Sequence, residues 1–256
     1  MLRENGFLRI VILILIWLPS SSFAVELKTS AQNSSPKFYK ISNNTMGGIC
    51  VDIMHAIERI NPEIQFNGYH TFLPFKRLQV YLERGELDVF FGLKKTEKRK
   101  QKYNFLDIPL YQINYVVAAR IDDKASITTF DDIRSLSAEG KILTIFGSAA
   151  SNFLHQQGGL LIDDSAASPT ILLKKLMVNR GRLAFYHDLG LQKEIENENL
   201  GKEIKILPIS FQKYSHYAAF SKKVPPDTIL LIETALEKLR STGELTSIHR
   251  KYNLVE

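Results

Sequence analysis

Cysteine is almost absent from this sequence, and its absence removes several kinds of site at once. Cys50 is the only cysteine among 256 residues, so the chain cannot form an intramolecular disulfide. It lies in the apolar-rich run GGICVDIMHAI, which favours a small buried hydrophobic side chain over a reactive thiol. The six histidines are scattered, without the paired helical spacing or the Cys/His knuckle that binds zinc. We therefore expect neither a metal nor a cofactor.

Recognisable catalytic and membrane-spanning patterns are missing as well. The motif G-x-S-x-G does not occur, and Ser148 and Ser151 in FGSAAS have no base identifiable nearby in the sequence. The apolar run IVILILIWL, residues 10–18, is shorter than the ~20 residues that a membrane-spanning helix needs. These absences argue against nucleophilic catalysis and against an N-terminal membrane anchor.

The first 24 residues have the pattern of a secretory signal peptide. Arg3 and Arg9 form a positive start, the short apolar run follows, and Ser22 and Ala24 stand at the −3 and −1 positions of a cleavage site. No cysteine lies near this exit, which argues against a lipid anchor. Cleavage after Ala24 predicts a periplasmic protein whose remaining length suits one large or two small domains.

The net charge of +6 is modest and does not by itself indicate a nucleic acid as partner. The densest basic stretch is FGLKKTEKRKQKYNF, residues 91–105, with six basic side chains and one acid. Only Tyr103 and Phe105 lie near it, whereas a nucleic-acid surface needs interleaved aromatic residues. Its lysines suit a solvated face. Arg99 differs, because a planar guanidinium matches a carboxylate bidentately and an ammonium does not.

Strand and helix patterns alternate along the chain, which indicates an α/β fold with parallel sheets. The apolar residues of ICVDIMHAIERI, 49–60, fall on one helical face, and LDVFF, 87–91, has the composition of a buried strand. Residues 25–37 are polar, and we expect them to be frayed. The plan of residues 80–92, a helix, a glycine and a short apolar strand, recurs at 175–187 and suggests two similar lobes.

Two strand ends carry residues that can bind a ligand, since ligands of open α/β sheets bind beyond the carboxyl ends of strands. FGSAAS lies between a predicted strand and a predicted helix, where backbone N–H groups bind anions. Ser148 alternatively serves only as the helix N-cap. Asp188 follows the strand RLAFYH and can pair with an ammonium group, or it merely caps the next helix. The residues alone leave both alternatives open.

The chain from about residue 38 to 254 resembles the periplasmic solute-binding proteins of the polar amino-acid uptake class, extracellular solute-binding protein family 3. The resemblance rests on GGICVDIMHAI, PFKRLQVYLERGELDVFFGLKKTEKRKQKYNFLDIPLY, TTFDDIRSLSAEGKILTIFGSAAS, GRLAFYHD and ALEKLRSTGELTSIHRKYNL, in this order. It implies an α/β fold of two lobes, each a mainly parallel sheet flanked by helices, joined by two hinge crossings. Lobe 1 would comprise residues 25–112 and 210–256, and lobe 2 residues 113–209.

The resemblance also implies a ligand site between the lobes. The implied contacts are a carboxylate clamp at Arg99, backbone N–H groups at Ser148 and Ala149, an ammonium partner at Asp188 beside His187, a ligand-facing carbonyl at Gly92 and an aromatic contact at Phe75. Lys94 departs from the family pattern, which has a small hydroxyl residue there. Its ammonium favours an acidic ligand group, or it pairs with Asp188 or another acid of the cleft.

The function implied is capture of a polar amino acid or a similar small anionic solute for delivery to the permease of an ABC transporter. The protein would be a monomer without catalytic residues and without a nucleic-acid partner. One alternative is a dehydratase-like enzyme on the same scaffold, with His187 as general acid. Another is a sensory module that acts through a receptor.

Overall fold

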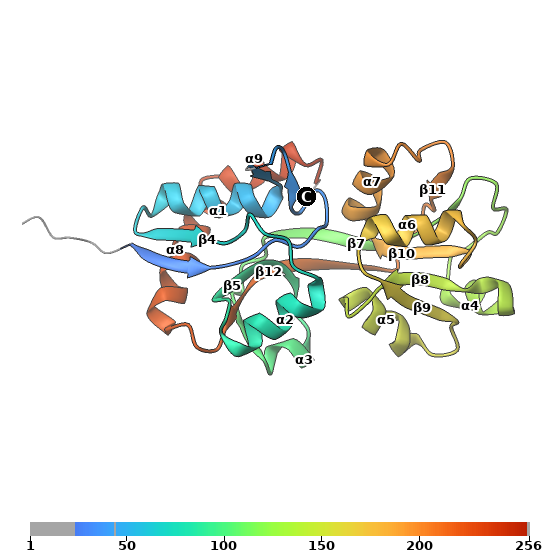
Figure 1. Cartoon of the computed structure of the whole chain (residues 1–256), viewed down its shortest axis with the longest axis horizontal. Helices are drawn as coiled ribbons and strands as arrows, with labels where there is room; N and C mark the ends of the chain where they lie inside the picture. Colours follow the sequence, from blue (N-terminus) through green and yellow to red (C-terminus); the bar gives the residue numbers. More distant parts are fainter. Residues whose placement is uncertain (1–23, 44, 255–256) are drawn as a thin grey trace, which may run out of the picture.

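The computed structural model of the chain describes residues 24–43 and 45–254 (Figure 1). The predicted signal peptide lies outside this part except for Ala24. The described chain forms two lobes that lie side by side, connected by long strands that run from one lobe into the other (Figure 1). Within the described ranges, none of the helices combines the length and the apolar composition that a bilayer crossing requires.

Lobe 1 contains both ends of the described chain. Its elements are β1 (Val25–Lys28), β2 (Tyr39–Lys40), β3 (Met46–Gly47), α1 (Ile49–Ile60), β4 (Ile64–Asn67), α2 (Phe75–Arg84), β5 (Val89–Lys94), α3 (Glu97–Lys100), β6 (Tyr103–Phe105), α8 (Pro226–Ser241) and α9 (Glu244–Lys251). The predicted helix at 49–60 is confirmed by α1, whose apolar face is buried.

Lobe 2 is built from the middle of the chain. Its elements are α4 (Phe130–Ser135), a 3₁₀ turn (Ser137–Gly140), β8 (Ile142–Ile145), α5 (Ala149–Gln157), β9 (Ile162–Ala166), α6 (Pro169–Met177), β10 (Leu183–His187), α7 (Asp188–Asn197) and β11 (Ile204–Ile206). Each of α5, α6 and α7 begins after a residue whose side chain accepts a hydrogen bond from a first-turn backbone N–H group.

The two hinge crossings are β7 (Tyr111–Arg120) and β12 (Gln212–Ser221), which pair with each other. They belong to one eight-stranded sheet with the order β5-β12-β7-β10-β8-β9, to which β6 and β11 are attached. Parallel pairing holds for β1 with β4 and for β8 with β9 and β10. The pairs that involve β7 and β12 are antiparallel, which the expectation of mainly parallel sheets missed. The chain crosses on β7 and returns on β12, so these strands run in opposite directions.

Each lobe is stabilised by a separate hydrophobic cluster of its own. The buried members of the first cluster lie between Leu27 and Ile113 and between Ala218 and Leu245, whereas those of the second lie between Tyr115 and Leu207. Along the chain, the buried residues pass from the first cluster to the second between Ile113 and Tyr115 in β7. They return to the first cluster between Leu207 and Ala218, the second of which lies in β12. Each lobe has a core of its own, which is what relative motion of two lobes about the crossing strands requires.

Residues 25–37 are ordered and largely buried, so the prediction that they are frayed is wrong. Residues 25–28 form β1, which pairs with β4, and polar side chains of residues 29–37 are buried behind it. The segment then passes the start of α1, where the carbonyl oxygens of Pro36 and Lys37 accept hydrogen bonds from the first backbone N–H groups of the helix. Polar composition misled the prediction because these polar side chains are buried rather than left in water, some with hydrogen-bond partners, as Ser30 with Thr71 and Gln32 with Lys37.

Gly48 allows this close approach. Its φ of 131° lies in a region that L-residues rarely adopt, and a Cβ atom there would stand 2.3 Å from the carbonyl oxygen of Lys37. Both the backbone conformation and the space therefore exclude a side chain. The contact fixes the backbone of Lys37 beside the first turn of α1.

We expect Gly48→Ala to lower the free energy of unfolding by about 2 kcal/mol or more, because backbone strain and overpacking each cost of that order. Gly201→Ala is the matched control, since a Cβ atom at Gly201 meets nothing within 4 Å. Chemical denaturation of the two variants measures the difference. Equal stabilities would contradict the role of Gly48.

Candidate functional site

A small cavity lies between the lobes. Both lobes contribute to its wall, which consists of Gln32, Lys37, Phe75, Gly92, Leu93, Lys94, Arg99, Tyr115, Ser148, Ala149, Ala150, Tyr186, His187, Tyr214 and His216. Its volume is about 30 Å³, which is about the space of one water molecule. A solute would therefore enter by separation of the lobes or by movement of a wall side chain.

Arg99 is buried at the end of β5, in the short helix α3 that Thr96 caps. Its Nη1 donates to the carbonyl oxygen of Lys94 at 3.0 Å, and its Cζ lies 5.6 Å from the centre of the Phe75 ring. The Nη2 group is buried without a hydrogen-bond partner. Burial lowers the pKa of Arg99, although a guanidinium keeps its charge at any physiological pH. An unpaired donor on a buried cation is a binding group for an anion.

Lys37 is a second cation of the cavity, one that sequence reasoning missed. Its Nζ donates to Gln32 Oε1 at 2.6 Å and to the carbonyl oxygen of Gly92 at 3.1 Å. The ammonium group therefore binds two acceptors of the chain itself, which is how a polar segment near the N-terminus can be buried. Burial is the largest cause that lowers the pKa of Lys37 to about 8, and the nearby charge of Arg99 lowers it further.

Lys94 lies among aromatic rings at the end of β5. Its Nζ stands 4.3 Å from the ring centre of Tyr214, 4.5 Å from that of Tyr115 and 5.5 Å from that of Phe153. These distances are those of cation–π contacts. The same Nζ donates to Gln212 Oε1 at 2.6 Å, so Lys94 is paired with an amide and not with Asp188. Partial burial lowers its pKa to about 8, with a contribution from Arg99.

The first turn of α5 faces the cavity from lobe 2. Ser148 is the N-cap, since its Oγ accepts from the backbone N–H of Ser151 at 3.0 Å, and Ala149 and Ala150 line the wall. The first N–H groups of a helix have no partner within the helix and attract anions. Both alternatives for Ser148 are thus compatible, because a capping residue also lies at the anion-binding end. Nearby, Gln79 Nε2 of α2 donates to the carbonyl oxygen of Gly147 at 3.2 Å and joins the two lobes.

His187 reaches the cavity from the end of β10 and caps α7. Its Nδ1 accepts a hydrogen bond from the backbone N–H of Gly190 at 2.9 Å. A backbone N–H can only donate, so Nδ1 carries no proton and Nε2 must carry it in the neutral ring. Burial lowers the pKa of His187 well below its usual value, which keeps the ring neutral. Nε2–H is buried without a partner and is a second unpaired donor of the cavity wall.

Asp188 lies apart from this cavity. Its Oδ1 accepts from the backbone N–H groups of Asn114 and Leu189, and its Oδ2 accepts from Asn114 Nδ2 at 2.8 Å. The carboxylate therefore connects the first turn of α7 to the crossing strand β7. The structure places Asp188 outside the small cavity, whereas the preceding residue, His187, lines its wall.

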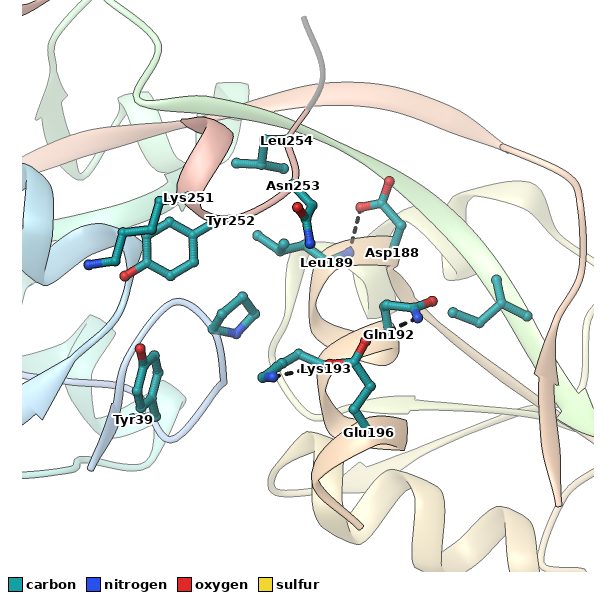
Figure 2. A pocket seen from close by; sticks show the side chains of 12 residues that line it. Tyr39, Asp188, Leu189, Gln192, Lys193, Glu196, Lys251, Tyr252, Asn253 and Leu254 are labelled. Atoms are coloured by element: carbon teal, nitrogen blue, oxygen red, sulfur yellow. Dashed lines mark hydrogen bonds and ion pairs between the residues drawn. The ribbon is translucent and has the colours of Figure 1, made fainter. Parts of the chain in front are cut away.

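Asp188 instead lines a larger groove of about 440 Å³ between α7 and the C-terminal segment (Figure 2). Tyr39 and Tyr252 form its other side in lobe 1, and Lys193 and Glu196 of α7 pair with each other at its rim (Figure 2). The groove is open and its charged groups have partners. Its described residues offer no unpaired buried polar group that would hold a small anion.

Seven of the eight predicted site residues line the small cavity together, namely Phe75, Gly92, Lys94, Arg99, Ser148, Ala149 and His187. The cavity residues that were missed include His216, whose Nδ1 is 3.0 Å from Tyr111 Oη beneath the cavity. Among the cavity-lining residues, none is an aspartate or a glutamate. In the described ranges no cluster of histidine, cysteine and acidic side chains is suited to a metal ion.

The two-lobed α/β fold with a polar cavity between the lobes is the architecture on which solute-binding proteins are built. The chain belongs to the bacterial extracellular solute-binding proteins, family 3, whose profile matches residues 27–255. A probable histidine-binding protein of Neisseria gonorrhoeae is 26% identical over 213 residues, which are 82% of this chain and 76% of that protein.

Solved structures share the fold at low sequence identity. An ancestral arginine-binding protein bound to glutamine has a TM-score of 0.75 and 19% identity, over 89% of this chain and 97% of the other. An ancestral amino acid-binding protein described as a precursor of cyclohexadienyl dehydratase has a TM-score of 0.72 and 15% identity, over 90% of this chain and 95% of the other. These likenesses confirm the predicted two-lobed fold.

The pKa of Lys37 is about 8 in the folded chain, compared with 10.5 for an ordinary lysine. Between these two pH values we expect the free energy of unfolding of the unmodified protein to rise relative to that of the Lys37→Met variant. In that window the folded state has released the proton that the unfolded state still binds, so the free energy of unfolding increases with pH. The slope should reach about 1.4 kcal/mol per pH unit. Denaturation curves from pH 7 to pH 11 measure it.

The matched control is Lys98→Met, which removes an exposed lysine of the same basic stretch. Its stability relative to the unmodified protein should stay constant over the same pH range. A constant difference for Lys37→Met as well would show that Lys37 is not buried in the folded protein.

Proposed function

We propose that the protein captures a polar amino acid or a similar small anionic solute in the cavity between its lobes. The observation that carries this proposal is the buried Arg99, whose Nη2 is unpaired at the cavity. A guanidinium binds a carboxylate through two parallel hydrogen bonds, and it does so more strongly where water is excluded. The N-terminal turn of α5 supports the proposal from the opposite lobe.

Delivery to the permease of an ABC transporter is the role that this binding would serve. Export to the periplasm through residues 1–24 as a cleaved signal peptide is part of the proposal, as are a monomeric state and the lobe boundaries at residues 112/113 and 209/210. The contact between Gln79 and Gly147 supports a closed arrangement in which the lobes meet around the solute. A permease could then distinguish the closed, solute-bound form of the protein from the open form by its shape.

We propose that the protein binds its solute without catalysis, because His187 is poorly suited to act as a general acid. A dehydratase-like enzyme would use this histidine as general acid. The ring is neutral because burial lowers its pKa, and Nδ1 is engaged by Gly190, so Nε2–H serves as a hydrogen-bond donor with little acidity. Turnover of a prephenate-like acid by the purified protein would favour the enzyme instead.

We expect Arg99→Ala to abolish the rise in melting temperature that the bound solute produces, because a ligand that binds the folded state stabilises it. The screen uses amino acids, dicarboxylates and polyamines on the purified protein. Loss of a buried charged partner costs about 2–5 kcal/mol, a weakening of at least about thirtyfold. Trp17 is the only tryptophan and precedes the predicted cleavage site, so melting is preferable to tryptophan fluorescence.

Lys98→Ala is the control for this substitution, because Lys98 is the exposed neighbour of Arg99 in α3. Its response to each solute should equal that of the unmodified protein. Arg99→Lys keeps a positive charge and should recover only part of the response. An undiminished response of Arg99→Ala would remove Arg99 from the site.

A further inference from the structure

The charges of the cavity wall are unbalanced. Arg99, Lys37 and Lys94 bring three cationic groups to it, and its described wall contains no carboxylate. A zwitterionic solute brings as much positive as negative charge and would leave this excess uncompensated on closure. Buried charges without a counter-charge are costly. The balance favours a solute that carries more than one negative charge.

The amide and carbonyl oxygens that could hold an ammonium group of a solute already accept from lysines of the chain. Gln32 Oε1 and the carbonyl oxygen of Gly92 both accept from Lys37. The ring faces of Tyr115 and Tyr214 surround the Nζ of Lys94, which also occupies Gln212 Oε1. The chain's own two ammonium groups thus take the positions that suit an ammonium group.

The unpaired buried groups of the wall are two donors, Arg99 Nη2 and His187 Nε2–H, and the Tyr115 hydroxyl, which can donate or accept. They lie on both lobes. Arg99 Nη2 belongs to lobe 1, whereas His187 Nε2–H and the first turn of α5 belong to lobe 2. Donors on opposite sides of a closing cavity suit a solute with an anionic group at each end. The His187 ring distinguishes between the two kinds of solute group. Because its proton is on Nε2, the ring donates to an anionic group and offers no acceptor to an ammonium group.

From these observations we propose that the cavity selects a small acid with two anionic groups and no ammonium group, such as a short dicarboxylate. This inference rests on the proposed function, since it names the ligand class of the same cavity. Lys94 is half-buried in the wall of the cavity. Arg99 binds one end, and His187 with the α5 turn binds the other.

The test compares two matched pairs by isothermal titration calorimetry of the purified protein at pH 7. Succinate and L-aspartate differ only in the ammonium group, as do glutarate and L-glutamate. In at least one pair we expect the dicarboxylate to bind about tenfold or more tightly than the amino acid, because the wall has three cations and no carboxylate, and its amide and carbonyl acceptors already bind the chain's own ammonium groups. L-Arginine, which has two cationic groups, should not bind measurably.

His187→Asp places a carboxylate where the imidazole stands, and Asp caps a helix N-terminus well. This variant should shift the affinity ratio toward the amino acid of each pair by about tenfold or more, as expected for a charge-assisted hydrogen bond. His187→Asn is the control, since asparagine also caps helices but carries no charge. It should keep the preference for the dicarboxylate. Melting curves without solute check that both variants fold.

The outcomes distinguish a failure of the dicarboxylate inference from a failure of the proposed function. Tighter or equal binding of the amino acid in both pairs, or binding of L-arginine, overturns the dicarboxylate inference and leaves the proposed function intact. An unchanged ratio in His187→Asp overturns the part assigned to His187. If none of the five solutes binds, the dicarboxylate inference fails, and the melting screen then decides the proposed function by its response to the other amino acids and anions.

Discussion

The burial of three cationic side chains in one cavity without a carboxylate is the constraint on which the site depends. Arg99, Lys37 and Lys94 all belong to lobe 1 and repel one another, and their burial between the lobes adds a desolvation cost. The chain offsets these costs with neutral groups: amide and carbonyl oxygens for Lys37, ring faces and an amide for Lys94, and a backbone carbonyl for Arg99. Neutral acceptors reduce the cost without cancelling the charge. The remaining positive potential is what attracts an anion.

The architecture has the features that relative motion of the two lobes requires. Each lobe has a core of its own, and the strands β7 and β12 connect the lobes in opposite directions. Asp188 binds Asn114 of β7, so the first turn of α7 is attached directly to the hinge. His187 is adjacent to this attachment. Bending of the crossing strands therefore carries His187 toward or away from the cations of lobe 1.

Sequence patterns predicted the features that depend on local periodicity and on side-chain chemistry. The apolar face of 49–60 indicated α1, and the planar fork of arginine distinguished Arg99 from the lysines around it. Lys37 could not be predicted, because its burial depends on Gln32 and on Gly92, which is far away in the chain. Both His187 and Asp188 were expected at the site, but which of them faces the cavity could not be predicted. Adjacent residues at a strand end point in different directions, and only the start of α7 determines which one faces the cavity.

The buried thiol beneath the cavity has a practical consequence. Cys50 is fully shielded, its Sγ lies 3.8 Å from Tyr111 Oη, and burial raises its pKa to about 12. A thiol that stays protonated reacts slowly with maleimides and with other electrophiles. A cysteine introduced on each lobe would therefore take up a fluorophore selectively, while the native cysteine needs no replacement. The separation of the two lobes could then be followed by energy transfer in a chain whose cavity is chemically untouched.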